Sequence, residues 1–165
     1  LEIKTYFPSI SLIKKGPRNR AFFLIITYII IIIMYIKSSQ TLVDEAKKKI
    51  ETLDSKEARH LFEKGEISLI DIRDIRELWR EGTIESSKHI PRGMLEFWLD
   101  PESSYYKKNK IHEIKKMVLF CALGLRSALA TKSLLDMGFK NVAHVNGGFD
   151  ALKNSGLKVI SKKKK

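Results

Sequence analysis

The chain has 165 residues, of which 44% are hydrophobic and 30% charged, and its formal net charge is +12. That length gives room for one domain with a single core, plus a short segment at an end. The mild basic excess suits small anionic substrates, but no basic stripe interleaves with aromatic residues, which argues against nucleic acid as a partner.

The first 40 residues are expected to form an N-terminal extension. Residues 21–36 are a continuous apolar run that includes five consecutive isoleucines. As a helix this run would be about 24 Å long, against a hydrocarbon core of about 30 Å, and no small-x-small cleavage site follows it. Because Met34 is the first methionine, we expect residues 1–33 to come from an over-extended start, which predicts a cytoplasmic protein. A membrane anchor through residues 21–36 is the alternative.

Residues 41–160 are expected to form the domain, and residues 161–165 a solvated lysine tail. Short β-branched runs alternate there with amphipathic stretches. They predict strands over 50–53, 67–72, 88–90, 117–120 and 141–145, and helices over 42–49, 56–64, 74–80, 93–99, 126–137 and 149–154. Asp54 or Ser55 can cap the second of these helices. This alternation predicts an α/β domain with a parallel sheet covered on both faces.

Residues that can carry chemistry stand at the ends of several predicted strands. They are Asp71, His89, Cys121 and Asn146. The carboxyl ends of parallel strands meet at the same edge of a sheet, and ligands bind beyond that edge. The sequence therefore predicts a site at this edge.

Cys121, the only cysteine, opens a loop between an apolar strand and an amphipathic helix, with four residues between it and Arg126. Backbone N–H groups in such a loop, and the positive end of the helix, favour the thiolate form of a cysteine and hold an anion against it. A lone cysteine cannot form an intramolecular disulfide, so the alternative to a nucleophile is plain packing. We expect a nucleophile.

A series of motifs makes this expectation more specific. In chain order they are 69–73 (Leu-Ile-Asp-Ile-Arg), 81–84 (Glu-Gly-Thr-Ile), 89–91 (His-Ile-Pro), 118–121 (Val-Leu-Phe-Cys), 126–130 (Arg-Ser-Ala-Leu-Ala), 138–139 (Gly-Phe), 141–142 (Asn-Val) and 147–149 (Gly-Gly-Phe). Together they resemble the single-domain rhodanese family, the thiosulfate sulfurtransferases, over most of one domain. The resemblance implies a rhodanese-like three-layer fold, with a parallel five-stranded sheet and helices on both faces.

The resemblance also implies a reaction. Cys121 takes sulfane sulfur from thiosulfate or a persulfide, becomes a persulfide, and passes the sulfur to an acceptor such as a thiol or cyanide. Arg126 is then the loop-closing arginine that helps to hold the anionic donor. The other residues expected to contact substrate are Ala122, Leu123, Gly124, Leu125 and Ser127. No cofactor is implied, and the four histidines lack metal-ligand spacing.

Three residues are expected to support this site. By resemblance, Asp71 and Arg73 orient neighbouring loops, and a purely structural ion pair is an equal alternative. Arg92 follows Pro91 at the same end of the sheet and is expected to add positive potential.

The chain departs from the family pattern at two places. Residues 82–87 read Gly-Thr-Ile-Glu-Ser-Ser where the family usually shows Gly-His-Ile-Pro-Gly-Ala, so the turn there can differ. Leu152 stands where a tryptophan commonly follows the Gly-Gly-Phe segment, which changes packing.

Other function classes stay open. A binding-class alternative is a non-turnover persulfide carrier or a rhodanese-like docking module. Enzyme alternatives are a phosphatase or an arsenate reductase of the same fold, which place five residues between cysteine and arginine and so cradle a tetrahedral oxyanion. Here there are four residues and no acidic residue within the loop, which favours sulfur over phosphate.

Overall fold

The computed structural model describes residues 22, 24–28, 36–108 and 116–164. It divides the chain into two units, Leu1–Ser38 and Ser39–Lys165. No helix among the described residues is long and apolar enough to cross a membrane. Most of the apolar run over 21–36 lies outside the described residues, so the over-extended start and the membrane anchor both stay predictions.

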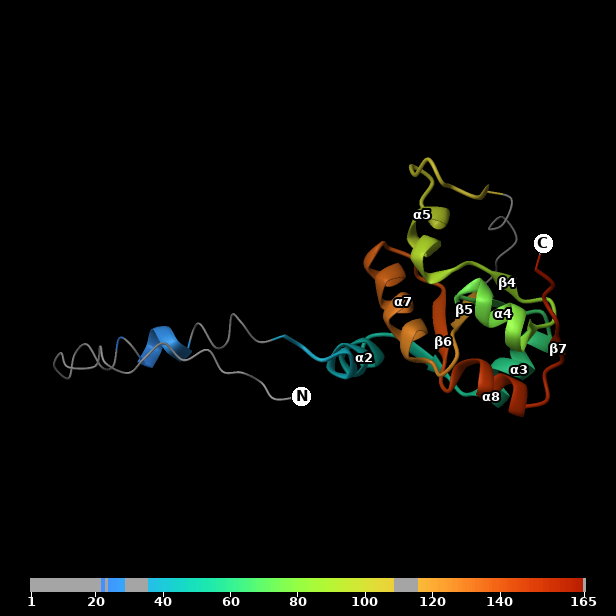
Figure 1. Ribbon diagram of the computed structural model, residues 1–165, viewed down its shortest axis with the longest axis horizontal. Coiled ribbons are helices and arrows are strands. Elements are labelled where there is room, and N and C mark those ends of the chain that lie inside the picture. Colours follow the sequence, from blue (N-terminus) through green and yellow to red (C-terminus); the bar gives the residue numbers. More distant parts are fainter. Residues whose placement is uncertain (1–21, 23, 29–35, 109–115, 165) are drawn as a thin grey trace. The chain divides into compact units, whose positions relative to one another are not determined.

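The second unit is built on a parallel sheet of five strands, β1 (Glu51–Leu53), β2 (Ser68–Asp71), β4 (Lys88–His89), β5 (Met117–Phe120) and β6 (Val142–Val145). Their order across the sheet is β1-β6-β5-β2-β4. Strands β4, β5 and β6 are labelled in Figure 1. Every bound lies within one residue of the expected range. The predicted parallel sheet is confirmed.

Helices follow most of these strands, as predicted. They are α2 (Ser39–Lys47), α3 (Ser55–Glu63), α4 (Ile75–Glu81), the 3₁₀ turn η2 (Arg92–Met94), α5 (Leu95–Leu99), α7 (Leu125–Asp136) and α8 (Gly148–Asn154). Asp54 caps α3, because its side chain accepts hydrogen bonds from the backbone N–H groups of Lys56 and Glu57. The helix predicted over 93–99 is divided between η2 and α5.

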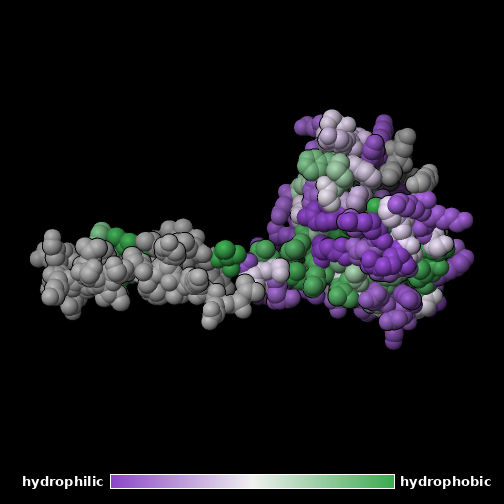
Figure 2. Space-filling view, in the orientation of Figure 1, coloured by the Kyte–Doolittle hydropathy of each residue, from purple (hydrophilic) through white to green (hydrophobic). Residues whose placement is uncertain are grey.

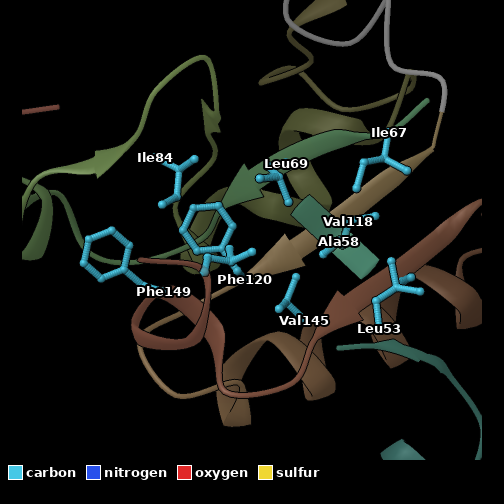
Figure 3. Packing of buried hydrophobic residues seen from close by; sticks show 11 residues of the cluster. Leu53, Ala58, Ile67, Leu69, Ile84, Val118, Phe120, Val145 and Phe149 are labelled. Carbon is cyan, nitrogen blue, oxygen red and sulfur yellow. The ribbon is translucent and has the colours of Figure 1, made fainter. Parts of the chain in front are cut away.

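The strands feed two hydrophobic clusters, one on each face of the sheet. Successive side chains of a strand point to opposite faces. Val118 and Phe120 of β5 pack with residues of α3 and α8, including Ala58 and Phe149 (Figure 3). The second cluster, with residues of α5 and α7, contains the alternate residues Met117, Leu119 and Cys121. The three-layer α/β arrangement follows from this alternation.

Polar and charged side chains cover much of the domain face seen in Figure 2.

Leu152, at the position where the family has a tryptophan, is fully buried in the cluster of Figure 3. The smaller side chain is therefore accommodated within the core.

A second, two-stranded sheet was not predicted. In it β3 (Thr83–Ile84) pairs antiparallel with β7 (Val159–Ile160). Two-residue strands are too short to show a periodicity, and their partners stand far apart in the chain. Ser86, where the family has its second glycine, has a φ of +62°. The turn thus keeps the left-handed conformation although its glycine is missing.

Candidate active site

Cys121 comes directly after β5, in the middle of the sheet. Strands β6 and β2 flank β5, so the segments that leave these two strands border the Cys121 loop. The Ile72 N–H donates to the Phe120 carbonyl at 3.0 Å, which extends the pairing to the base of the loop. The Cys121 side chain is buried, with 1% of the residue exposed.

Backbone hydrogen bonds from the start of α8 hold the loop. The Phe149 N–H donates to the Cys121 carbonyl at 2.7 Å, and the Asp150 N–H to the Ala122 carbonyl at 3.4 Å. On the other side of the loop, the Gly124 N–H donates to Cys121 Sγ at 3.2 Å. A backbone donor aimed at sulfur stabilises negative charge there.

Two glycines allow this close packing. Gly124 has a φ of +89° and Gly148 a φ of +59°, which side chains rarely adopt. A Cβ added at Gly148 would lie 2.3 Å from the Cys121 carbonyl oxygen. Glycine at this position therefore lets the loop pack directly against the first residue of α8.

Arg126 closes the loop and is bound by a carboxylate that the sequence had not suggested. Its Nη1 and Nη2 donate to Glu77 Oε2 and Oε1 at 2.7 and 2.8 Å. The bond to Glu77 raises the pKa of Arg126, and the nearby Cys121 acts in the same direction. In turn, Arg126 lowers the pKa of Glu77. Glu77 belongs to α4, and the signal for it in the sequence was the capping-box spacing after Asp74.

A second ion pair lies in the interior at the end of β2. Arg73 and Asp71 are both fully buried, with Arg73 Nη2 2.8 Å from Asp71 Oδ2. The same nitrogen donates to the Gly82 carbonyl at 2.7 Å, and Thr83 Oγ1 donates to Asp71 Oδ2 at 2.7 Å. The Arg73 guanidinium carbon lies 3.8 Å from the centre of the Phe149 ring. Arg73 thus connects β2, β3 and the start of α8.

His144 forms part of a hydrogen-bonded chain beneath the loop. Its Nε2 lies 3.0 Å from Thr52 Oγ1 and its Nδ1 3.4 Å from Ser127 Oγ. Ser127 Oγ donates to the Gly124 carbonyl at 3.1 Å. Burial, helped by the charge of Lys47, lowers the pKa of His144 to about 4. Ser127 therefore bonds the loop directly through the Gly124 carbonyl, and His144, which is neutral near pH 7, contacts Ser127 from below.

The remaining expected site residues differ in exposure. Ala122 is half-buried, while Leu123 and Leu125 are 60% and 43% exposed. Arg92 Nη1 is bound to Glu96 at 2.6 and 2.8 Å and its Nη2 to Ser133 at 3.3 Å, and its expected contribution to the positive potential stays a prediction. Arg92 joins α5 to α7 by these bonds.

In the part of the domain that the structure describes, no three His, Cys, Asp or Glu side chains gather in a way that could hold a metal ion. The arrangement around Cys121 can instead stabilise a sulfur anion at the end of a buried strand.

Comparison with known proteins agrees with this geometry. Residues 54–155 match the Rhodanese family, described as a rhodanese-like domain. The chain is 25% identical over 138 residues to rhodanese-like domain-containing protein 17 of Arabidopsis thaliana, covering 78% of this chain and 84% of the relative. Several other curated relatives are longer, and the chain spans between 24% and 29% of their length.

Two solved structures are also similar. One is a protein of unknown function from Rhodopseudomonas palustris, described as a possible tyrosine phosphatase, with 45% identity, a TM-score of 0.71, and coverage of 77% of this chain and 97% of that one. The other is the polysulfide-sulfur transferase homodimer of Wolinella succinogenes, with 33% identity, a TM-score of 0.56, and coverage of 75% and 88%. On the match over residues 54–155 and this fold, the chain belongs to the family of rhodanese-like domain proteins.

Proposed function

We propose that this domain is a sulfurtransferase that carries sulfane sulfur as a persulfide on Cys121. The observation that carries the proposal is the 3.2 Å hydrogen bond from the Gly124 N–H to Cys121 Sγ, inside a loop that Arg126 closes. The likeness to the polysulfide-sulfur transferase of Wolinella succinogenes supports the same class of chemistry.

With thiosulfate as donor, the reaction has two balanced steps. The Cys121 thiolate attacks the outer sulfur of thiosulfate, the S–S bond breaks with its electron pair going to the leaving group, and sulfite departs. The enzyme then holds a persulfide anion. An acceptor such as cyanide or a thiolate attacks the outer sulfur of this persulfide and takes it away, which restores the Cys121 thiolate.

The loop residues supply the stabilising groups in this scheme. The Gly124 N–H, which points at Cys121 Sγ, stabilises the persulfide anion, and Arg126 attracts the anionic donor. Ser127 holds the Gly124 carbonyl in place. Asp71 and Arg73 support the neighbouring turns from the interior, and Arg92, which also contacts α5 and α7, adds positive potential at the same end of the sheet.

Intact mass spectrometry tests the proposal. After incubation with thiosulfate and removal of the excess, the protein should gain the mass of one sulfur, and cyanide should remove it. Cys121→Ser should gain none, because a serine hydroxyl stays protonated and is a poor sulfur nucleophile. Serine-variant protein that still forms a persulfide or turns over thiosulfate would show that Cys121 is not the carrier. A stable persulfide that cyanide cannot discharge would favour a carrier protein.

A phosphatase is the second candidate, because the relative from Rhodopseudomonas palustris is described as a possible tyrosine phosphatase. The four-residue spacing from Cys121 to Arg126 makes a smaller loop than phosphate chemistry uses. We expect negligible hydrolysis of aryl phosphates. Efficient hydrolysis that is lost in Cys121→Ser would replace the sulfurtransferase proposal.

A further inference from the structure

Glu77 has no part in the sulfur-transfer steps, yet it binds the arginine of the loop. Both of its carboxylate oxygens accept hydrogen bonds from Arg126, at 2.7 and 2.8 Å. The Glu77 side chain is 18% exposed and that of Arg126 43% exposed. A negative charge therefore stands beside the guanidinium that is proposed to attract the donor.

The start of α4 holds Glu77 in this position. Its Oε2 accepts the Asp74 N–H at 3.1 Å, while the Asp74 side chain caps the helix from the other direction. This reciprocal capping box fixes the carboxylate at the third residue of the helix. Because α4 follows β2, and β2 pairs with β5, the helix start lies beside the Cys121 loop.

The charges around the loop bear on which donors it accepts. Leu123 and Leu125, the exposed residues of the loop, add none. Lys47 donates to the Asn146 side chain at 3.1 Å, so it contributes positive charge from the β6 side, independently of Glu77. Coulomb energy is proportional to charge, so the Glu77 carboxylate disfavours a dianion twice as strongly as a monoanion at the same distance.

We propose that Glu77 determines donor specificity by neutralising Arg126, which disfavours dianionic thiosulfate relative to donors of lower charge. This inference rests on the proposed function and deepens it by naming the donor class, one that carries at most one negative charge, of which an alkyl persulfide RSSH is the example. The Cys121 thiolate attacks the outer sulfur of RSSH, the S–S bond breaks, and RS⁻ leaves. The proton stays on the transferred sulfur until it is lost to solvent. Thiosulfate is then a poorer donor for the same cysteine.

The variant Glu77→Gln removes the charge and keeps the shape. Its amide oxygen can still accept the Asp74 N–H, since glutamine also serves at this position of a capping box. For thiosulfate, KM should fall about five-fold with kcat unchanged, and added salt should reduce this gain. With 2-mercaptoethanol persulfide as donor, kcat/KM should rise by at most about 2.2-fold, the square root of five, because this donor carries at most one charge and is therefore repelled with at most half the energy.

Glu63→Gln is the matched control. It removes the same charge from an arginine pair on α3, where Glu63 binds Arg59 at 2.7 Å. This substitution should leave both donors unaffected. An equal gain in the control would show that net charge alone is responsible, and a loss of kcat/KM with both donors in Glu77→Gln would show that Glu77 only positions Arg126. Either result overturns the inference.

Binding measured without turnover separates this inference from the proposed function. In the Cys121→Ser protein, titration calorimetry should show thiosulfate binding about five-fold more tightly once Glu77→Gln is added. Unchanged or weaker binding overturns the role of Glu77. If wild-type Cys121 gains no sulfur from either donor, the sulfurtransferase proposal fails, while the calorimetry still decides whether Glu77 opposes a dianion.

Discussion

Two of the arginine–carboxylate pairs at the carboxyl end of the sheet, Arg73–Asp71 and Arg126–Glu77, differ in burial more than in chemistry. Arg73 and Asp71 are both fully buried. Arg126 and Glu77 form a similar two-bonded pair, but these side chains are 43% and 18% exposed. The buried guanidinium also binds the Gly82 carbonyl and stacks on Phe149.

This difference indicates what each pair can do. A buried charge whose partner is removed has no water to replace it, so the Arg73 pair is committed to the fold. A half-exposed guanidinium can exchange a carboxylate for another anion at small cost. The Arg126 pair therefore suits a substrate site, and the following substitutions test this contrast.

The largest effect is expected for Arg73→Met. It leaves Asp71 buried without its counterion, and the free energy of unfolding should fall by about 3–5 kcal/mol. Arg126→Met should lower it by less than about 1 kcal/mol, because its pair is half-exposed. Urea unfolding of both variants measures the two values. Equal losses would remove the distinction between the pairs.

Arg126→Ala should affect catalysis more than folding. Loss of a charge-assisted contact to the donor should lower kcat/KM for thiosulfate by about 10- to 100-fold. Arg126→Lys should restore only part of the lost kcat/KM, since lysine cannot offer the planar pair of N–H donors of a guanidinium. Steady-state assays with thiosulfate and cyanide measure these ratios, and an alanine variant that behaves like wild type would contradict the role of Arg126.

His144 links the loop to the pH dependence of stability. Its pKa in the folded protein is about 4, below the ordinary value of 6.5, so the unfolded chain binds this proton first as the pH falls. The contribution of His144 to the free energy of unfolding is therefore complete above pH 6.5. It is lost as the pH falls towards 4, at up to about 1.4 kcal/mol per pH unit.

Urea unfolding at several pH values, for wild type and His144→Gln, isolates this contribution. In the variant, the free energy of unfolding should no longer fall between pH 6.5 and 4.5 through this group. Carboxylates with a lowered pKa, such as Glu77, add a slope of the same sign only as the pH falls below about 4.5. An identical slope in the two proteins would show that His144 is not held neutral.

The smallest effect is expected for Ser86→Gly, in the turn next to the Arg73 pair. Ser86 has a φ of +62°, and glycine relieves that strain but increases the entropy of the unfolded chain, so the net gain should be about 0.5 kcal/mol. Ser87→Gly is the control and should destabilise, because Ser87 Oγ donates to the Ile84 carbonyl at 2.6 Å. A loss of stability in Ser86→Gly would mean that its side chain contributes more than the strain costs.

The sequence by itself determined the parallel sheet and the position of the cysteine loop. Runs such as Ile67–Ile72, which is rich in β-branched residues, and Met117–Phe120, which is apolar throughout, have the length of a strand, and this pattern is local. Cys121 and Arg126 belong to one short loop after such a strand, so their proximity also follows from the chain. Their roles in sulfur transfer stay predictions.

The tertiary structure alone decided which groups surround that loop. The Glu77–Arg126 pair joins residues 49 positions apart. The hydrogen bond between Thr52 and His144 beneath the loop joins residues 92 positions apart. The predicted topology placed Arg92 at the same end of the sheet as Cys121, and the tertiary structure gave its side chain the partners Glu96 and Ser133. Such contacts depend on the order of strands in the sheet and on the direction in which each helix leaves it, and no periodicity within one segment encodes either.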